Sequence, residues 1–313
     1  MPLNIAIIGA GVGGLTLAIA LQDNPNLSIQ VYERATELKE IGALVGVGPN
    51  ALRTLEKLGV TDVLTDEVGW RSPSGIPMIF RHWKTDELLG TDQYHDVPDR
   101  RHHYARMHRA KLQQALLKRV PSGVIHLGKK VEAVTVVREK GATVTFTDGT
   151  SIEADVVVGA DGIKSELTPP SPAQQASSSA PASATGFGVT ASYAVNPETN
   201  PQPTWNGPAS VDTVREHFKD WAPVIPKIIS RIPSVRQYAN VAGPELEGWT
   251  FADRVTLLGD AAHTHGSAFA AGVGLAIDDA YALGLAFDHV LPPDVVNTTG
   301  VVSVDRVGEI FEL

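Results

Sequence analysis

Three glycine-rich turns, each directly after a short aliphatic run, constrain the fold of this 313-residue chain more than any other feature. The turns are Gly9–Gly14, Gly159–Gly162 and Gly259–Asp260. Short aliphatic runs rich in β-branched residues predict buried parallel strands. The pattern therefore predicts an α/β fold in which three strands each end in a glycine turn. The second and third turns also carry an aspartate.

The first turn has the spacing of a dinucleotide-binding motif. Gly9 allows the tight turn, Gly11 lets the backbone approach a pyrophosphate, and Gly14 lets helix pack on strand. The predicted helix through Leu15–Leu21 presents free N–H groups and a positive dipole end to phosphate. Glu33 ends the next predicted strand, where a carboxylate accepts hydrogen bonds from ribose hydroxyls. That acid disfavours a 2′-phosphate, so FAD or NAD is expected rather than NADP.

Composition narrows the function classes. The net charge of −9 argues against a nucleic-acid partner. Because the chain has no cysteine, disulfides and thiolate metal sites are excluded. The histidines, among them His102, His103, His108 and His263, have no acidic partner at ligand-like spacing, so no metal site is expected. No apolar run is long enough to span a membrane, so a cytoplasmic location is expected. The expected oligomeric state is a monomer or a homodimer.

Periodicity and turn residues predict the remaining elements. Residues 41–47 are predicted as a loop, and Met78–Trp83 as one of several short strands. Residues 171–184 contain only Ser, Pro, Ala and Gln, which predicts a flexible linker. The predicted helices are Pro49–Leu58, Arg109–Val120, Val211–Asp220, Val224–Arg231 and Gly272–Val290, and further strands are Val124–Leu127, Lys130–Val137 and Thr143–Phe146.

Five segments together resemble the FAD-dependent aromatic hydroxylases, single-component flavoprotein monooxygenases that include salicylate-hydroxylase-like enzymes. They are GAGVGG with Glu33, IGALVGVGPNALRTLEKLG, MHRAKLQQALL, VVVGADGIKS and LLGDAAHTHGSAFAAGVGLAIDDA. The resemblance implies a Rossmann-like FAD-binding domain with an inserted, incomplete substrate domain on a mixed or antiparallel sheet. The expected boundaries are 1–69, 101–168 and 250–290 for the FAD-binding domain, 70–100 and 185–249 for the substrate domain, 169–184 for the linker and 291–313 for a poorly defined tail.

The resemblance also implies roles for residues of the first half of the chain. The turn with Gly9, Gly11 and Gly14 would hold the FAD pyrophosphate, and Glu33 the adenosine ribose. Gly46, in a small-residue loop, would let the backbone approach the cofactor. Arg109 matches a cofactor-contacting arginine, whose guanidinium can bridge phosphate or ribityl oxygens. Val131 matches a position whose backbone meets the adenine.

Further implied roles fall on the second and third turns. Asp161 resembles the second acid–glycine turn of the family, near the cofactor and on the nicotinamide-nucleotide route. Asp260, after Gly259, resembles the acid that hydrogen-bonds the ribityl chain. Gly272 and Val273 would aim helix N–H groups at the pyrimidine carbonyl of the flavin, which stabilises negative charge on the reduced ring.

The implied activity is hydroxylation of a small phenolic or hydroxybenzoate-like aromatic substrate, with FAD, NADH or NADPH and O2. No catalytic residue is assigned. Departures from the family pattern leave an alternative open. Many members carry an arginine beside the residue that matches Tyr193, where this chain has Ala194. Members also commonly carry an arginine shortly after the residue that matches Ser165, where this chain continues with Glu166. That alternative is a shortened FAD-binding homologue with little or no hydroxylase activity. A simple NAD-dependent dehydrogenase would explain the first turn alone.

Overall fold

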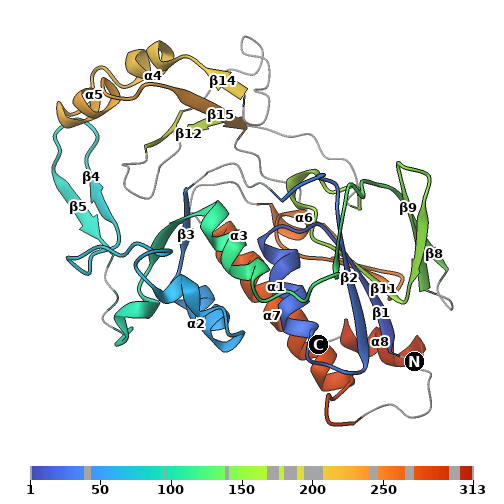
Figure 1. Ribbon diagram of the computed structural model, residues 1–313. Coiled ribbons are helices and arrows are strands. Elements are labelled where there is room, and N and C mark those ends of the chain that lie inside the picture. The colour runs from blue at the N-terminus through green and yellow to red at the C-terminus, as the bar shows by residue number, and fades with distance from the viewer. Residues whose placement is uncertain are drawn as a thin grey trace.

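A six-stranded sheet with the order β16-β17-β11-β1-β2-β7 runs through the larger part of the molecule (Figure 1). Every pairing in it is parallel except that of β16 with β17. Its strands are β1 (Leu3–Ile8), β2 (Leu27–Glu33), β7 (Ile125–Leu127), β11 (Val156–Gly159), β16 (Thr250–Phe251) and β17 (Val255–Leu257). The computed structural model describes residues 2–38, 44–92, 94, 96–137, 141–167, 176–179, 189–193, 207–239, 246–264, 271–295 and 304–311.

Helices pack on one face of this sheet. α1 (Val12–Leu21) is apolar on nearly all sides and contacts α3 (Arg109–Leu117) and α7 (Gly272–Val290), and α7 in turn contacts α2 (Pro49–Lys57). A helix that is apolar all round has to be buried, and Leu15, Leu17 and Phe287 have no exposed surface. Burial of each such side chain contributes about 1.5–3 kcal/mol. The predicted helix Gly272–Val290 is confirmed at both ends.

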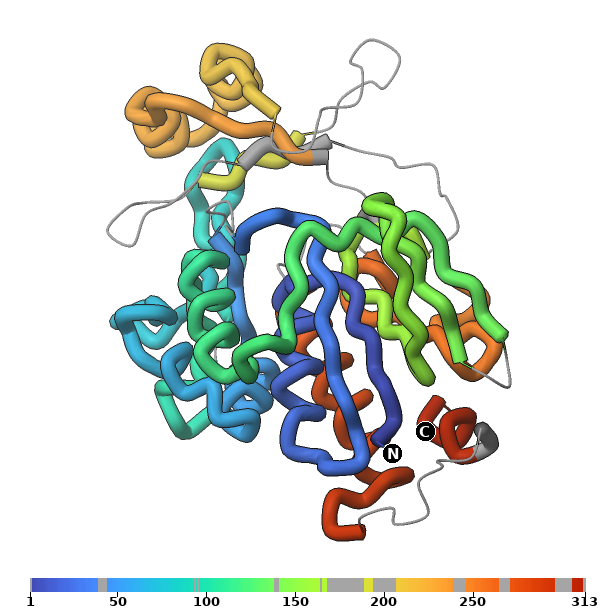
Figure 2. The backbone as a smooth tube through the Cα atoms, turned by 45° about the vertical axis from the view of Figure 1, so that its right-hand side comes forward, coloured from blue at the N-terminus to red at the C-terminus, as the bar shows by residue number. Residues whose placement is uncertain are grey.

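A three-stranded antiparallel sheet covers the opposite face (Figure 2). It consists of β8 (Val131–Val137), β9 (Gly141–Phe146) and β10 (Ser151–Ala154). Ile8, Tyr32 and Val157 of the parallel sheet pack there against Val144 and Phe146. The result is a three-layer arrangement of helices, parallel sheet and antiparallel sheet.

A second, smaller part of the chain has its own sheet and core. The sheet order is β13-β12-β15-β14, all antiparallel, from β12 (Ala176–Ser179), β13 (Thr190–Ser192), β14 (Gly207–Ala209) and β15 (Val235–Ala239). Helices α4 (Val211–His217) and α5 (Val224–Ile229) contribute Val214, Phe218 and Ile229 to its core. The prediction of a flexible linker was therefore wrong at 176–179, because these residues form strand β12, which pairs with β13 and β15. Residues 171–175 and 180–184 lie outside the described residues.

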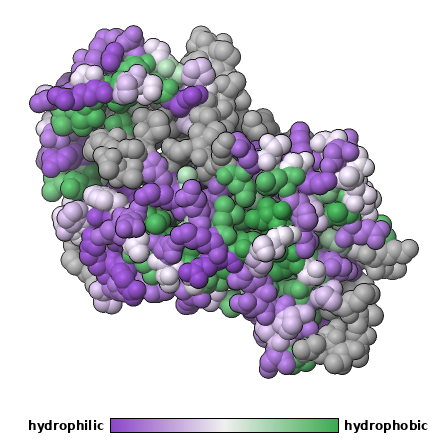
Figure 3. Space-filling model, in the orientation of Figure 1, coloured by the Kyte–Doolittle hydropathy of each residue, from purple (hydrophilic) through white to green (hydrophobic). Residues whose placement is uncertain are grey.

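Two small antiparallel ribbons are separate from these sheets. β3 (Leu44–Val47) pairs with β6 (Ala105–His108), and β4 (Ile79–Arg81) pairs with β5 (Leu88–Thr91). The loop prediction was thus wrong for 44–47, while 41–43 lie outside the described residues. The β4–β5 ribbon reaches the smaller part, where the Trp83 carbonyl accepts a hydrogen bond from Ala222 N–H at 2.8 Å. Apolar surface is visible on this ribbon at the left edge of Figure 3, in agreement with the exposure of Leu88 and Leu89.

The end of the chain contains a helix that the sequence did not predict. α8 (Val304–Ile310) contacts α7 and buries Val307 and Ile310 in the main core. This corrects the expectation of a poorly defined tail for these residues. Of the helices described, none has the length and apolar character needed to cross a membrane.

Candidate functional site

Parallel pairing brings the three glycine-rich turns to one edge of the six-stranded sheet. In the observed register, Ile8 lies beside both Tyr32 and Gly159, and Gly159 lies beside Leu257. Because these strands run in the same direction, their carboxyl ends meet at this edge, where ligands of open α/β sheets bind. The turns that follow these strands therefore lie next to one another.

The first turn depends on two glycines. Gly9 has a φ of +108°, and a Cβ there would lie 2.5 Å from the backbone oxygen of Ala160. A Cβ at Gly14 would lie 2.0 Å from the backbone oxygen of Gly9. Glu33 lies at the same turn, because its Oε2 accepts a hydrogen bond from Ala10 N–H at 2.8 Å. The acid and the glycine turn predicted from the sequence are thus side by side.

The N-terminus of α1 begins in this turn without a capping side chain. A Cβ at Gly11, the residue before the helix, would come no closer than 4.0 Å to the backbone oxygen of Ala160, so the backbone is open to a ligand on this side. Free helical N–H groups and the helix dipole favour a phosphate there. The turn, the uncapped helix and Glu33 therefore fit the pyrophosphate and ribose of a dinucleotide such as FAD.

The second turn partly buries an aspartate, Asp161. Oδ2 of Asp161 accepts a hydrogen bond from Glu166 N–H at 2.9 Å, whereas the buried Oδ1 has no partner among the described residues. Burial raises the pKa of Asp161 above its ordinary value, although a hydrogen bond from Ser165 acts in the opposite direction. An unpaired buried oxygen costs about 1–3 kcal/mol. A ligand that donates a hydrogen bond to Oδ1 would remove this cost.

A single carboxylate ties the third turn to α7. Oδ2 of Asp279 accepts a hydrogen bond from Gly259 N–H at 2.8 Å and lies 2.6 Å from Nε2 of His263. The hydrogen bond with Asp279 raises the pKa of His263, against the effect of burial. Asp260 is the exposed first residue of α6 (Asp260–His263). The His263–Asp279 pair thus holds the turn that presents Asp260.

Gly272 and Val273 are the first two residues of α7, whose cap residue, Ala271, makes no side-chain hydrogen bond. The helix is fixed to α2 through Asp278, which accepts hydrogen bonds from Thr54 Oγ1 at 3.0 Å and from Asn50 Nδ2. The N-terminal N–H groups of α7 are therefore held in a defined place without an internal capping group.

Arg109 and Val131 lie on elements connected to the first turn. Arg109 is the half-buried first residue of α3, and Gln113, one helical turn later, contacts the backbone of the first turn at 3.5 Å. Val131 opens β8 and is 5% exposed. Just before it, Lys129 N–H donates to the backbone oxygen of Glu33 at 2.8 Å.

Gly46 leaves room for an aromatic side chain. It lies on β3 opposite Arg106 of β6, and a Cβ on Gly46 would fall 1.7 Å from the hydroxyl oxygen of Tyr104. Gly46 was expected to let the backbone approach a cofactor. The structure adds a second reason for a glycine there, because a larger residue in this strand would clash with Tyr104.

Sequence reasoning missed Tyr104, Arg106 and Asp279 as residues of this region. The two adjacent acids Asp278 and Asp279 inside the largely apolar α7 were a usable signal for Asp279, whereas the pairing of β3 with β6 is not visible in the sequence. Across the described ranges, no three His, Asp or Glu side chains gather as ligands of a metal ion would.

The parallel sheet, the glycine turn before an uncapped helix and the acid after β2 define a dinucleotide-binding α/β protein. Comparisons with family models give two matches. Residues 233–294 match the FAD binding domain, and residues 73–192 match the Lycopene cyclase protein family.

Curated relatives match over most of the chain. The chain is 28% identical to the 6-hydroxynicotinate 3-monooxygenase of Pseudomonas fluorescens, over 91% of this chain and 83% of that protein. It is 27% identical to a salicylate hydroxylase of Pseudomonas putida, over 90% of this chain and 76% of that protein.

Solved structures share the fold. HpxO of Klebsiella pneumoniae complexed with FAD matches with a TM-score of 0.75 and 23% identity, covering 98% of this chain and 84% of that one. A salicylate hydroxylase substrate complex matches with a TM-score of 0.74 and 22% identity, covering 99% and 89%. The chain is thus similar to monooxygenases, salicylate hydroxylase among them, and part of it matches the FAD binding domain.

Proposed function

We propose that the protein is an FAD-dependent monooxygenase that uses NADH or NADPH and O2 to hydroxylate a small phenolic or hydroxybenzoate-like aromatic substrate. The observation that carries the proposal is the meeting of three glycine turns, with Glu33, Asp161 and Asp260, at one edge of the sheet. A nicotinamide dehydrogenase needs only the first turn. FAD extends from an adenosine ribose through a pyrophosphate and a ribityl chain to the flavin ring, and it can use all three.

In this proposal Glu33 accepts hydrogen bonds from the adenosine ribose, and Asp260 accepts them from the ribityl chain. The N–H groups at Gly272 and Val273 stabilise negative charge on the ring. The bound flavin supplies the redox chemistry, and the protein supplies binding and orientation. The cytoplasmic location and the monomeric or homodimeric state expected from the sequence stay predictions.

The test is to load the purified chain with FAD and follow NADH and NADPH oxidation with and without salicylate, hydroxybenzoates and phenols. We expect retained flavin, seen by absorbance and fluorescence quenching, and oxidation that increases with an aromatic compound. Retained flavin without any stimulation would favour the homologue that binds FAD but has little activity. Tight binding of NAD without retention of flavin would contradict the proposal.

Asp260→Ala tests the ribityl role directly. Loss of a charge-assisted hydrogen bond costs about 1.5–3 kcal/mol, so we expect the Kd for FAD to rise roughly 10- to 100-fold. Asp212→Ala is the control, because Asp212 is an exposed acid on α4 that pairs with Arg215 in the smaller part of the chain. Equal FAD affinity of the two variants, measured by flavin titration, would rule out the role proposed for Asp260.

A further inference from the structure

The outward face of the β3–β6 ribbon carries polar side chains whose hydrogen-bonding groups the fold uses only in part. Along this segment, Ala105 and Met107 are 0% and 2% exposed and belong to the main core. Tyr104, Arg106 and His108 alternate with them and are only partly buried. Because successive side chains of a strand point to opposite faces, these three residues share the face turned away from the core.

On this face the guanidinium of Arg106 lies between two aromatic rings. Its Cζ is 5.4 Å from the ring centroid of Tyr104 and 5.9 Å from that of Trp70. Reciprocal backbone hydrogen bonds of 2.8 Å join Trp70 and Arg106, so the main chain fixes their spacing. Tyr104, Arg106 and Trp70 are called the arginine cluster below.

The guanidinium of Arg106 has N–H donors that remain available to a ligand. Nη2 of Arg106 donates to the backbone oxygen of Pro77 at 2.6 Å, and within the described residues no carboxylate forms an ion pair with Arg106. A guanidinium has five N–H donors. Burial raises the pKa of Tyr104, the charge of Arg106 acts against this, and the charge of Asp92 adds to it, but Asp92 does not pair with the arginine. Nε2 of His108, on the same face, is buried without a partner in the described part of the chain.

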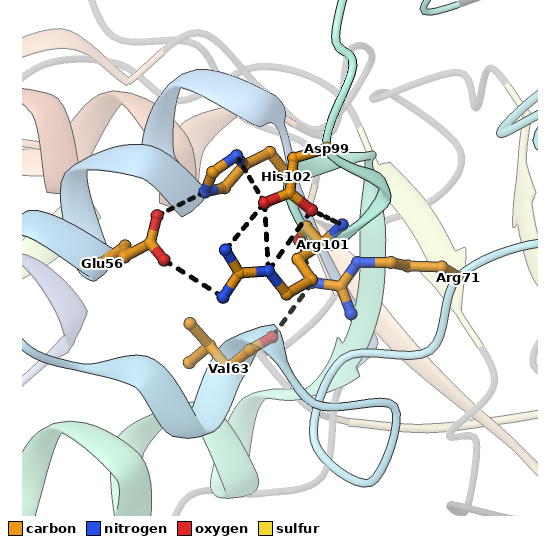
Figure 4. Close-up of polar contacts among 6 residues, drawn as sticks. All are labelled: Glu56, Val63, Arg71, Asp99, Arg101 and His102. Atoms are coloured by element: carbon orange, nitrogen blue, oxygen red, sulfur yellow. Dashed lines mark hydrogen bonds and ion pairs between the residues drawn. The ribbon is translucent and has the colours of Figure 1, made fainter.

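A polar network fixes the segments that carry the arginine cluster (Figure 4). Arg71 has a side chain only 1% exposed and donates to the backbone oxygens of Val63 at 3.2 Å and Arg101 at 2.6 Å. Arg101 pairs with Glu56 of α2 at 3.3 Å, and His102 lies 2.6 Å from the same carboxylate. The residue after Trp70 and the segment before Tyr104 are thus held to α2, so the arginine cluster is preorganised.

We propose that the arginine cluster binds the anionic group of the substrate, a carboxylate on an aromatic ring. A planar carboxylate can accept two parallel hydrogen bonds from a guanidinium, and the flanking rings suit the apolar ring attached to it. Gly46 lies directly opposite Arg106, so the cluster adjoins a residue of the proposed cofactor site. The inference rests on the proposed function for the aromatic substrate and adds the group by which the protein recognises it.

The test compares benzoate with benzamide, its uncharged counterpart, by calorimetric titration of the full chain with and without FAD. Wild type should bind benzoate at least about 10-fold more tightly than benzamide. Arg106→Gln should weaken benzoate binding roughly 10- to 100-fold and leave benzamide binding within about 3-fold. Arg106→Lys should fall between them, because a lysine keeps the charge and loses the planar pair of donors.

Arg81→Gln is the matched control, since Arg81 is an exposed arginine of the neighbouring β4–β5 ribbon that pairs with Asp86. It should leave the preference for benzoate unchanged. If Arg106→Gln does not fold, the inference is still tested by the benzoate preference of the wild type and by the smaller preference expected of Arg106→Lys. Equal or no binding of the two ligands by wild type, or a benzoate preference that survives undiminished in either Arg106 variant, would overturn the inference. Failure to retain FAD with an intact benzoate preference would instead count against the proposed function alone.

Discussion

Tyr104 occupies the space that a side chain at Gly46 would need, and this contact joins the proposed cofactor site to the arginine cluster. A Cβ 1.7 Å from the hydroxyl oxygen forces the ring or the strand to move. Overpacking of this kind costs about 1–3 kcal/mol, so Gly46→Ala should lower the free energy of unfolding by that amount. Urea denaturation followed by circular dichroism measures the loss.

Gly90→Ala is the control at the residue scale, because nothing lies within 4 Å of a Cβ at Gly90, which is also on a ribbon strand. It should change stability by less than about 0.5 kcal/mol. In the background of Tyr104→Ala, Gly46→Ala should lose most of its cost. An equal effect of the two glycine substitutions in the wild type would show that the ring does not limit Gly46.

At the scale of elements, the His263–Asp279 pair connects α6 to α7. The pKa of folded His263 is raised above its ordinary value of 6.5 by Asp279. A raised pKa in the folded state means that the stabilisation is complete below about pH 6.5 and is lost as the pH rises through the folded pKa. The free energy of unfolding should therefore fall as the pH rises from 6.5 into the alkaline range.

Asp279→Asn should remove this pH dependence and lower stability by about 1–3 kcal/mol below pH 6.5. Asp278→Asn is the control, because Asp278 bonds to Asn50 and Thr54 rather than to a histidine. Asp278→Asn should lower the free energy of unfolding and leave its pH dependence unchanged. Thermal unfolding across pH measures both variants, and an unchanged slope in Asp279→Asn would mean that another group is responsible.

Local signals explain which elements could be predicted. Gly272 opens α7 and Pro292 follows its end, so its bounds could be read from the sequence. The strand at 176–179 could not, because small polar residues form it only through pairing with β13 and β15, which are distant in the chain. α8 likewise depends on burial of Val307 and Ile310 against the main core.

At the scale of the whole molecule, the sequence predicted the glycine turns and the acids beside them, and the parallel register explains why they meet. The arginine cluster could not be predicted in this way. Trp70 and Arg106 are joined by an isolated bridge between segments far apart in the sequence, and neither lies in a motif with a recognised spacing.

In the proposed reaction the protein hydroxylates an aromatic ring with one oxygen atom from O2. Incubation of the FAD-loaded chain with NADH or NADPH and a hydroxybenzoate under isotopically labelled dioxygen, followed by mass spectrometry of the product, tests it most directly. We expect a hydroxylated product that carries one labelled oxygen atom and forms only when FAD is present. Consumption of NADH or NADPH by the flavin-loaded chain without any labelled aromatic product would contradict it.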